Sequence, residues 1–220
     1  MRTRARSGSS MVPTRFTVTR SVDLSLASTE DITQAMRSLR HAYLIDVEGV
    51  TEIWLVRHAD VYDGLEGVPD PPLSRLGVDQ AARLARRLQQ LEIRAVYSSP
   101  HQRALQTAEA LSDRIAIEPR LAEARARYAA GKVQIQESPR AVIQRMQEAV
   151  DLAVAAHSGG RVVMVTHGIA ILNYLCDVLQ LAPGTLRLFP DFTSISVVRV
   201  KGDRRMAGSM CDIAHLEPVP

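Results

Sequence analysis

The segment Ile53-Trp54-Leu55-Val56-Arg57-His58-Ala59 is an apolar run that ends abruptly in an arginine and a histidine. A second segment, Val162-Val163-Met164-Val165-Thr166-His167-Gly168, repeats this arrangement. Short apolar runs of this kind predict buried strands, and an open α/β sheet binds its ligands beyond the carboxyl ends of its strands. The two segments therefore predict two imidazoles, those of His58 and His167, that face one point.

The composition narrows the class of protein. A chain of 220 residues suits one domain with an appendage, and 46% hydrophobic with 23% charged residues is typical of a soluble globular protein. The net charge of +3 is too small to indicate nucleic acid, and no run approaches the ~18 apolar residues of a membrane span. We therefore expect that the protein binds neither nucleic acid nor a membrane. Cys176 and Cys211 lie in different contexts, which favours free thiols in the cytoplasm over a disulfide.

Residues 1–50 are predicted to form an N-terminal extension to the main domain, residues 51–220. The first 22 residues hold five arginines and no acid, a composition typical of organelle transit peptides. No apolar helical face accompanies these arginines, however. We therefore expect a disordered basic tail, or a true start of translation at Met11.

The rest of the extension is predicted to contain a strand and a helix. Apolar and polar residues alternate from Phe16 to Leu26, which indicates a half-buried strand. Ser28–Asp31 resembles a capping box, and apolar residues at three-to-four spacing then predict a helix over about Thr29–Ala42. This unit can pack on the main domain or on a second copy of the chain in a homodimer, and the sequence leaves both open.

Strand and helix patterns alternate through the main domain. Strands are predicted at 52–57, 94–97, 115–117 and 161–166, helices at 76–91, 100–112, 139–157 and 169–179, and a terminal hairpin at 193–200 and 204–210. Strands separated by helices favour a largely parallel sheet with helices on both faces, and the hairpin adds an antiparallel edge. The predicted fold is an α/β fold, a three-layer α/β/α sandwich with a mostly parallel central sheet.

The predicted strand ends carry groups that suit a phosphate ester. A phosphate monoester dianion needs several donors with positive charge, and arginine offers a planar fork of them. Arg57, His58 and His167 lie at strand ends, and Arg103 lies near the start of the helix after the 94–97 strand. All of these groups reach one edge of a parallel sheet. Gly168 leaves room for an anion at the following helix N-terminus, so the set predicts a small phosphorylated substrate.

Each of these residues also has an ordinary structural interpretation. A single histidine at a strand end is more often a core residue, and Arg103 could pair with Glu109 or Asp113 on its own helix. His101, close to Arg103, is either a residue at the substrate rim or a surface residue. Four cationic or imidazole groups at equivalent strand edges nevertheless favour a site over an accidental arrangement.

Four ordered motifs make the sequence resemble a known family. They are Val56-Arg57-His58-Ala59, Leu73-Ser74-x-x-Gly77-x-x-Gln80-Ala81, Tyr97-Ser98-Ser99-Pro100-x-x-Arg103-Ala104-x-x-Thr107-Ala108 and Val165-Thr166-His167-Gly168. Over about residues 52–200 the chain resembles the histidine phosphatase superfamily, in its phosphoglycerate mutase-like branch. The resemblance implies a nucleophilic His58 that becomes a phosphohistidine. It also implies that Arg57, Arg103 and His167 hold the phosphoryl oxygens, with no metal and no cofactor.

The resemblance also implies a proton donor for the leaving alcohol. Similar proteins carry a Leu-x-Glu sequence after the second arginine motif, and Leu121-Ala122-Glu123 matches it. Glu123 is therefore the predicted general acid, and its alternative is an exposed carboxylate paired with Arg120 or Arg125. Asp60 is a second candidate acid.

Two departures from the family pattern bear on the substrate. The usual Gly-x-Trp-Glu-Gly continuation is absent after Glu123, and Arg125, Arg127 and Lys132 could instead meet an anionic part of the substrate. After His58, where many members carry a polar residue that touches phosphate, an acidic loop contains Asp60, Asp63 and Gly64. Such a loop would repel a highly anionic substrate or accept a hydroxyl or amine group, so Asp60 is also a candidate rim residue.

These patterns favour a metal-independent phosphomonoester hydrolase that acts through a phosphohistidine. A phosphoglycerate-type phosphomutase and a non-catalytic protein that binds a phosphorylated ligand are the alternatives. A metallohydrolase that uses His58, Asp60 and His167 is a third, and activity that survives chelation would eliminate it.

Overall fold

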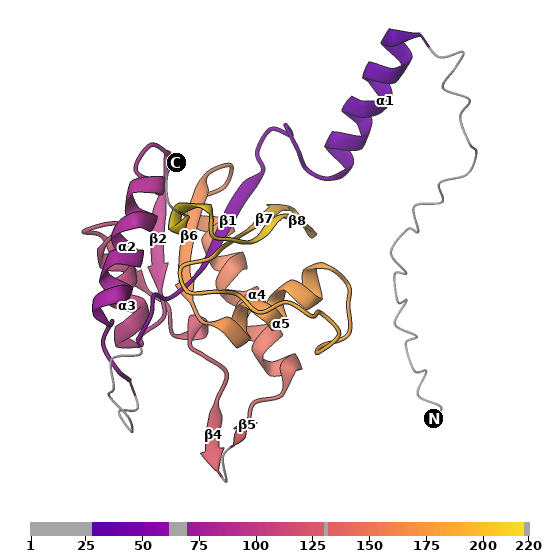
Figure 1. Cartoon of the computed structure of the whole chain (residues 1–220). Helices are drawn as coiled ribbons and strands as arrows, with labels where there is room; N and C mark the ends of the chain where they lie inside the picture. The colour runs from indigo at the N-terminus through magenta and orange to yellow at the C-terminus, as the bar shows by residue number, and fades with distance from the viewer. Residues whose placement is uncertain (1–27, 62–69, 130–131, 218–220) are drawn as a thin grey trace, which may run out of the picture. The chain divides into compact units, whose positions relative to one another are not determined.

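Figure 1 shows the computed structural model of the chain, which describes residues 28–61, 70–129 and 132–217. The chain divides into two compact units, Met1–Leu39 and Arg40–Pro220. This division lies ahead of the predicted domain start at residue 51, and Leu44 in the second unit is already buried. The predicted basic tail and the strand predicted from Phe16 to Leu26 lie outside the described residues.

Helix α1 (Thr29–Ala42) has the bounds predicted for it. Its capping box is reciprocal, because the Ser28 hydroxyl accepts the Asp31 N–H at 3.1 Å and the Asp31 carboxylate accepts the Ser28 N–H at 3.1 Å. Ile32 and Met36 on this helix are exposed. The start of α1 is thus set by local hydrogen bonds, which is why the sequence locates it.

The central sheet has six strands in the order β3-β2-β6-β1-β7-β8. Their bounds are β1 (Thr51–Arg57), β2 (Ala95–Ser98), β3 (Ile115–Ile117), β6 (Arg161–Thr166), β7 (Ile195–Lys201) and β8 (Arg204–Asp212). The first four strands in the sheet order are parallel, and β7 and β8 continue it antiparallel. The predicted mostly parallel sheet with an antiparallel edge is confirmed. Its central pair, β1 and β6, carries the two histidine motifs.

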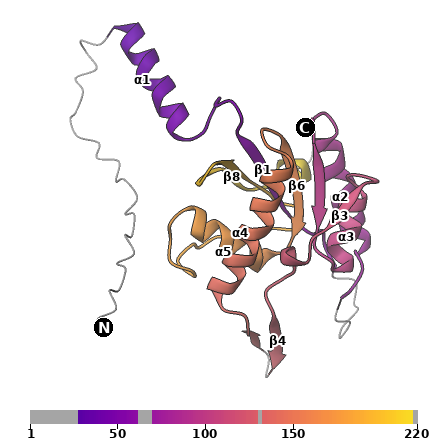
Figure 2. The ribbon, with the colours of Figure 1, turned by 180° about the vertical axis from the view of Figure 1, so that it is seen from behind.

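Helices cover both faces of this sheet (Figures 1 and 2). Helices α4 (Pro139–Ala156) and α5 (Gly168–Val178) pack on one face, and α2 (Arg75–Leu88) and α3 (Gln102–Glu109) pack on the other. The three predicted layers are therefore present. None of the helices among the described residues has both the length and the apolar character needed to cross a membrane.

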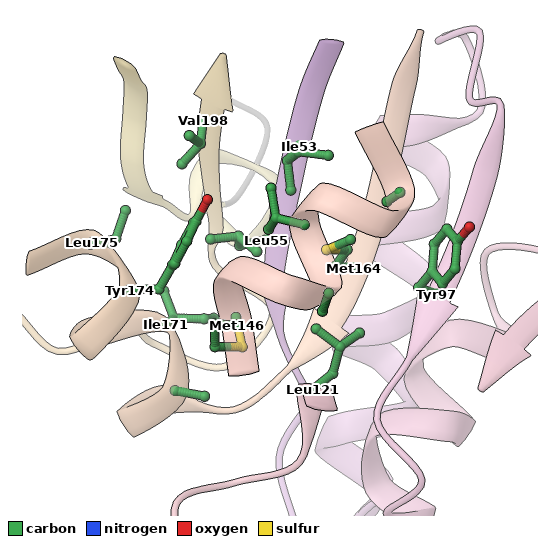
Figure 3. Packing of buried hydrophobic residues seen from close by; sticks show 14 of the residues in the cluster. Ile53, Leu55, Tyr97, Leu121, Met146, Met164, Ile171, Tyr174, Leu175 and Val198 are labelled. Atoms are coloured by element: carbon green, nitrogen blue, oxygen red, sulfur yellow. The ribbon is translucent and has the colours of Figure 1, made fainter. Parts of the chain in front are cut away.

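Alternate strand residues pack into two separate cores. In Figure 3, Leu55 of β1 and Met164 of β6 lie against the layer that contains Met146 of α4. Val56, the next residue along β1, packs with Leu84 of α2 on the opposite face. Full burial of one such side chain stabilises the fold by roughly 1.5–3 kcal/mol. Packing on both faces therefore holds the ends of β1 and β6 in fixed positions.

A hairpin that the sequence patterns do not indicate follows the 3-10 turn η2 (Pro119–Leu121). It consists of β4 (Ala126–Ala129) and β5 (Lys132–Ile135), which form a separate two-stranded sheet. In Figure 1 the hairpin extends from the end of the molecule toward which the β2 arrow points. The hairpin, which includes Arg127 and Lys132, therefore lies at the same end of the fold as the carboxyl edge of the parallel strands.

The predicted terminal hairpin is formed by β7 and β8, with a turn at Gly202 and Asp203. A second 3-10 turn, η3 (Ala214–Leu216), follows it. Cys176 is buried in α5 and Cys211 is partly buried in β8, and both thiols are free.

Candidate active site

The two histidine motifs meet because β1 and β6 are neighbouring parallel strands. Arg57 pairs with Thr166 in the strand register, and the His58 N–H donates to the Thr166 carbonyl at 2.9 Å. The two strands therefore end side by side. The centroids of the His58 and His167 rings lie 5.0 Å apart, so the structure brings together the two imidazoles that the sequence predicts.

The surroundings of His58 define its tautomer. Its Nδ1 lies 2.8 Å from the Ala59 carbonyl oxygen, which can only accept, so Nδ1 carries the hydrogen. Its Nε2 lies 3.2 Å from Nε of Arg103, which can only donate, so Nε2 carries the lone pair. The side chain is 6% exposed, and burial, followed by the positive charges of Arg103 and Arg57, lowers the pKa of His58 to about 3. His58 is therefore a neutral imidazole whose unprotonated Nε2 carries the lone pair.

Arg103 reaches the site from the first turn of α3. Its Nη1 donates to the Asp70 carboxylate at 2.9 Å, so its ion pair is with Asp70 and not with Glu109 or Asp113. Thr107 fixes the helix to the segment after β1, because its hydroxyl accepts the Ala59 N–H at 3.0 Å and donates to the Arg103 carbonyl at 2.7 Å. The guanidinium is thereby aimed at His58.

Arg57 is held by a loop that the sequence analysis did not connect with the site. Its guanidinium carbon lies 3.9 Å from the centroid of the Phe192 ring and 5.0 Å from that of Phe189. Its Nη1 donates to the Pro190 carbonyl at 2.7 Å. The side chain thus stays beside His58, and no local pattern in the sequence signals these distant partners.

His167 is fully buried and belongs to a network with Ser99 and His101. Its Nε2 lies 2.8 Å from the Ser99 hydroxyl and 3.1 Å from Nδ1 of His101. Burial, with the charges of His58 and Arg103 next, lowers the pKa of His167 well below its ordinary value. The buried Nδ1 of His167 has no hydrogen-bond partner among the described residues.

His101 lies beside His167, and its side chain is partly exposed. Its role at the substrate rim stays a prediction. Ser99 is a partner that the sequence analysis missed, although it lies inside one of the quoted motifs. Three imidazoles lie close together here, yet no group of three or more His, Cys, Asp or Glu side chains in the described part of the chain is arranged to hold a metal ion.

The Glu123 carboxylate lies at the N-terminus of α5. It accepts the N–H groups of Ala124 at 2.8 Å, Ala170 at 3.1 Å and Ile169 at 3.3 Å. These contacts differ from the alternative of an exposed carboxylate, and Arg120 pairs with Glu118 instead. Burial raises the pKa of Glu123, while the three backbone bonds and the charge of Arg103 oppose the shift.

Arg145 of α4 supports the segment that carries Glu123. Its Nη1 donates to the carbonyls of Arg120 at 2.6 Å and Ala122 at 2.7 Å, and its Nε donates to the Glu137 carboxylate at 2.8 Å. Sequence reasoning missed Arg145, because an arginine on a long helix has no pattern that distinguishes it from a solvated one.

Gly168 lies directly after His167, at the start of α5. A Cβ atom at this position would lie 2.8 Å from Cζ of Phe189, which is too close for an ordinary contact. The missing side chain therefore makes room for the Phe189 ring. Its predicted contact with a phosphate remains a prediction, and in this structure the Glu123 carboxylate binds the N–H groups of the following two residues.

Asp60 is buried at the start of the loop after β1. Its carboxylate accepts the Ser74 hydroxyl at 2.6 Å, and its carbonyl accepts the Ser74 N–H at 2.9 Å. A Cβ at Gly77 would lie 2.1 Å from the Asp60 carbonyl oxygen, so this glycine permits the close approach of α2. These contacts support a structural role for Asp60, while its roles as rim residue or acid stay predictions. Asp63 and Gly64 lie outside the described residues.

Fold and site together define a class: an α/β protein in which two arginines and neutral imidazoles converge at the carboxyl edge of a parallel sheet, where they suit a phosphate dianion. The chain matches the histidine phosphatase superfamily (branch 1) over residues 53–134 and 123–212. It belongs to that superfamily, and the predicted resemblance is confirmed.

Individual relatives are similar over most of the chain. A protein of Proteus mirabilis (strain HI4320) described as "Probable phosphoglycerate mutase GpmB" is 29% identical over 206 residues, covering 76% of this chain and 96% of that protein. The structure of YhfR from Bacillus stearothermophilus is 26% identical with a TM-score of 0.66, covering 76% of this chain and 100% of that one. A phosphoserine phosphatase of Entamoeba histolytica, solved with phosphoserine, is 19% identical with a TM-score of 0.64, and shares the fold.

Proposed function

We propose that this protein is a metal-independent phosphomonoester hydrolase that works through a phosphohistidine on His58. The observation that carries the proposal is the state of the His58 ring. Its Nδ1–H donates to the Ala59 carbonyl, and its unprotonated Nε2 accepts from Nε of Arg103. A neutral imidazole nitrogen fixed in this way is a good nucleophile near neutral pH.

The first half-reaction transfers the phosphoryl group of a small phosphorylated substrate to the enzyme. Nε2 of His58 attacks phosphorus, and the bond from phosphorus to the ester oxygen breaks on the opposite side. Charge that develops on the three remaining oxygens is met by Arg57, Arg103 and a hydrogen on His167 Nδ1. The alcohol leaves with a proton from Glu123, whose pKa is raised by burial.

The second half-reaction returns the enzyme to its starting state. The Glu123 carboxylate takes a proton from a water molecule, and the resulting oxygen attacks the phosphorus of the phosphohistidine. The bond from phosphorus to His58 Nε2 breaks, inorganic phosphate leaves, and Glu123 is protonated again. The three backbone N–H bonds stabilise the carboxylate form of Glu123 during this step.

The experiment that tests the proposal traps the intermediate. The enzyme is mixed with a phosphomonoester in the presence of a strong chelator, quenched, and digested to locate the phosphate. We expect an acid-labile, base-stable phosphoryl group on His58 and none in His58→Ala, which should stay folded. A phosphate on Ser98 or Ser99, or activity that disappears with chelation, contradicts the proposal.

A phosphoglycerate-type phosphomutase is the second candidate, because the Proteus mirabilis relative is described as a probable enzyme of that kind. The same phosphohistidine would then pass to a second hydroxyl and not to water. Incubation with a bisphosphoglycerate separates the two functions. Transfer to phosphoglycerate favours the mutase, and release of inorganic phosphate favours the hydrolase.

A further inference from the structure

The loop between α5 and β7 places two aromatic rings at the site. Phe192 lies with its ring centroid 5.6 Å from that of His58, and Phe189 and Phe192 both stack on the Arg57 guanidinium. The Pro190 carbonyl accepts from the same guanidinium. The loop therefore sets the position of one phosphoryl-binding arginine and forms an aromatic wall next to it.

Phe189 is the outer member of this wall. Its ring contacts Arg57 on one side and lies over Gly168, and its side chain nevertheless remains 54% exposed. A large aromatic ring beside a charged site presents apolar surface that water solvates poorly. Such a surface suits a ligand ring that would cover it.

The direction of the reaction tells which part of the substrate would reach this ring. In an in-line displacement the alcohol departs from the face of phosphorus opposite His58. In the proposed reaction the departing alcohol takes its proton from Glu123, whose carboxylate accepts the N–H groups of Ile169 and Ala170. These residues directly follow Gly168, over which the Phe189 ring lies. Phe189 is therefore the exposed ring that we place beside the departing alcohol.

We propose that Phe189 is a specificity-determining platform for the alcohol part of the substrate, and that this alcohol carries an aromatic or other apolar ring close to the ester oxygen. The inference rests on the proposed function, which assigns the phosphoryl group to Arg57. It adds a preference between substrates that the phosphoryl-binding residues, which contact every phosphomonoester alike, do not provide.

Two matched ligand pairs test the proposal. Calorimetry compares the binding of 3-phenylpropylphosphonate and butylphosphonate, neither of which can be hydrolysed. Kinetics compares 2-phenylethyl phosphate with butyl phosphate, because their leaving alcohols are similar in acidity. In the unmodified protein we expect the ring-bearing ligand to bind about tenfold more tightly and to have a lower KM, as aromatic contacts of this kind allow. The turnover numbers of the two esters should be similar.

Variants of Phe189 locate the preference. Phe189→Ala should reduce the ratio of the two affinities to nearly one, and Phe189→Leu, which keeps bulk over Gly168, should leave an intermediate ratio. A loosened Arg57 would weaken both ligands equally and leave the ratio unchanged. Met210→Ala, at an exposed apolar residue of β8, is the matched control and should keep the full ratio.

The outcomes separate this inference from the proposed function. Equal affinities in the unmodified protein, or a preference that survives Phe189→Ala, overturn the platform even if a phosphohistidine forms. If the preference for a ring depends on Phe189 but no phosphohistidine forms, the platform is supported and the proposed hydrolase function is refuted. If neither phosphonate binds, the platform is overturned as well.

Discussion

Replacement of Glu123 by glutamine tests the proton-transfer step with little disturbance of the fold. Oε1 accepts the N–H groups of Ala124 and Ala170, and Oε2 accepts that of Ile169. Glutamine has a single oxygen, so it keeps both bonds to Oε1 and loses the bond to Ile169. That bond is the longest of the three at 3.3 Å, and its loss should lower the free energy of unfolding by about 1 kcal/mol.

The kinetic effect should depend on the leaving group. An alkyl phosphate needs a proton on its departing oxygen, and general acid catalysis contributes roughly 10²–10⁴-fold to such a step. We expect Glu123→Gln to lower kcat for an alkyl phosphate by about a hundredfold or more, while an activated aryl phosphate loses less than about tenfold. Steady-state kinetics with butyl phosphate and 4-nitrophenyl phosphate measures both losses.

The pH dependence has a defined sign. Burial raises the pKa of Glu123 above its ordinary value of 4.5. The stability that this group contributes is present below that ordinary value and is lost as the pH rises through the folded-state pKa. Turnover of alkyl phosphates, which needs the protonated acid, should fall over the same rise. Both dependences should disappear in Glu123→Gln.

Equal losses on the alkyl and aryl substrates would refute the acid role and make Glu123 a structural residue. The matched comparison is Asp60→Asn, which removes the other candidate acid. Because Asp60 binds Ser74 inside the fold, we expect this variant to lose stability without any selectivity between the two substrates. A loss confined to the alkyl ester in Asp60→Asn would transfer the role to Asp60.

Three further predictions follow from the contacts around these groups. Arg145→Met should lower the free energy of unfolding, measured by denaturant, by about 3 kcal/mol, because it removes the ion-pair partner of the buried Glu137 carboxylate. Its remaining activity should show the same selective loss on alkyl phosphates as Glu123→Gln. Ser99→Ala removes the hydroxyl that lies 2.8 Å from His167 Nε2 and that, in the proposed reaction, donates to this nitrogen. We expect kcat to fall about tenfold for every substrate and nitrogen-15 NMR to show a changed His167 tautomer. Burial holds the pKa of His58 at about 3 and that of His167 below its ordinary value of 6.5. The stability that these neutral rings contribute is therefore present above pH 6.5 and is lost as the pH falls toward 3. An unfolding temperature that stays constant over this range would contradict the argument from burial.

The sheet, its helices and the two histidine motifs could be predicted because their signals are local. Alternate residues of β1 and β6 are apolar on both faces, and each strand ends where the charged or imidazole residues begin. Parallel pairing then places His58 and His167 together without further information. Arg103 is predicted by its place at the start of the helix after β2, and Glu123 by its match to a family motif. The structure brings Arg103 to His58 and Glu123 to the start of α5.

The remaining features depend on contacts between residues far apart in the chain. Arg57 and Pro190 are 133 residues apart, and His101 and His167 are 66 apart. No periodicity or cap links such pairs, so neither the aromatic wall on Arg57 nor the imidazole network could be read from either segment alone.

The sequence alone predicts which strands end in His58 and His167, and which arginines accompany them. The way those side chains are held depends on the tertiary structure. There the Asp60 carboxylate accepts from Ser74, the N-cap of α2, the Glu123 carboxylate accepts N–H groups of α5, and the exposed Phe189 ring lies against Arg57. The physical reason is that strand and helix patterns follow from neighbours along the chain, whereas a side chain's tautomer, partners and exposure follow from packing between separate elements.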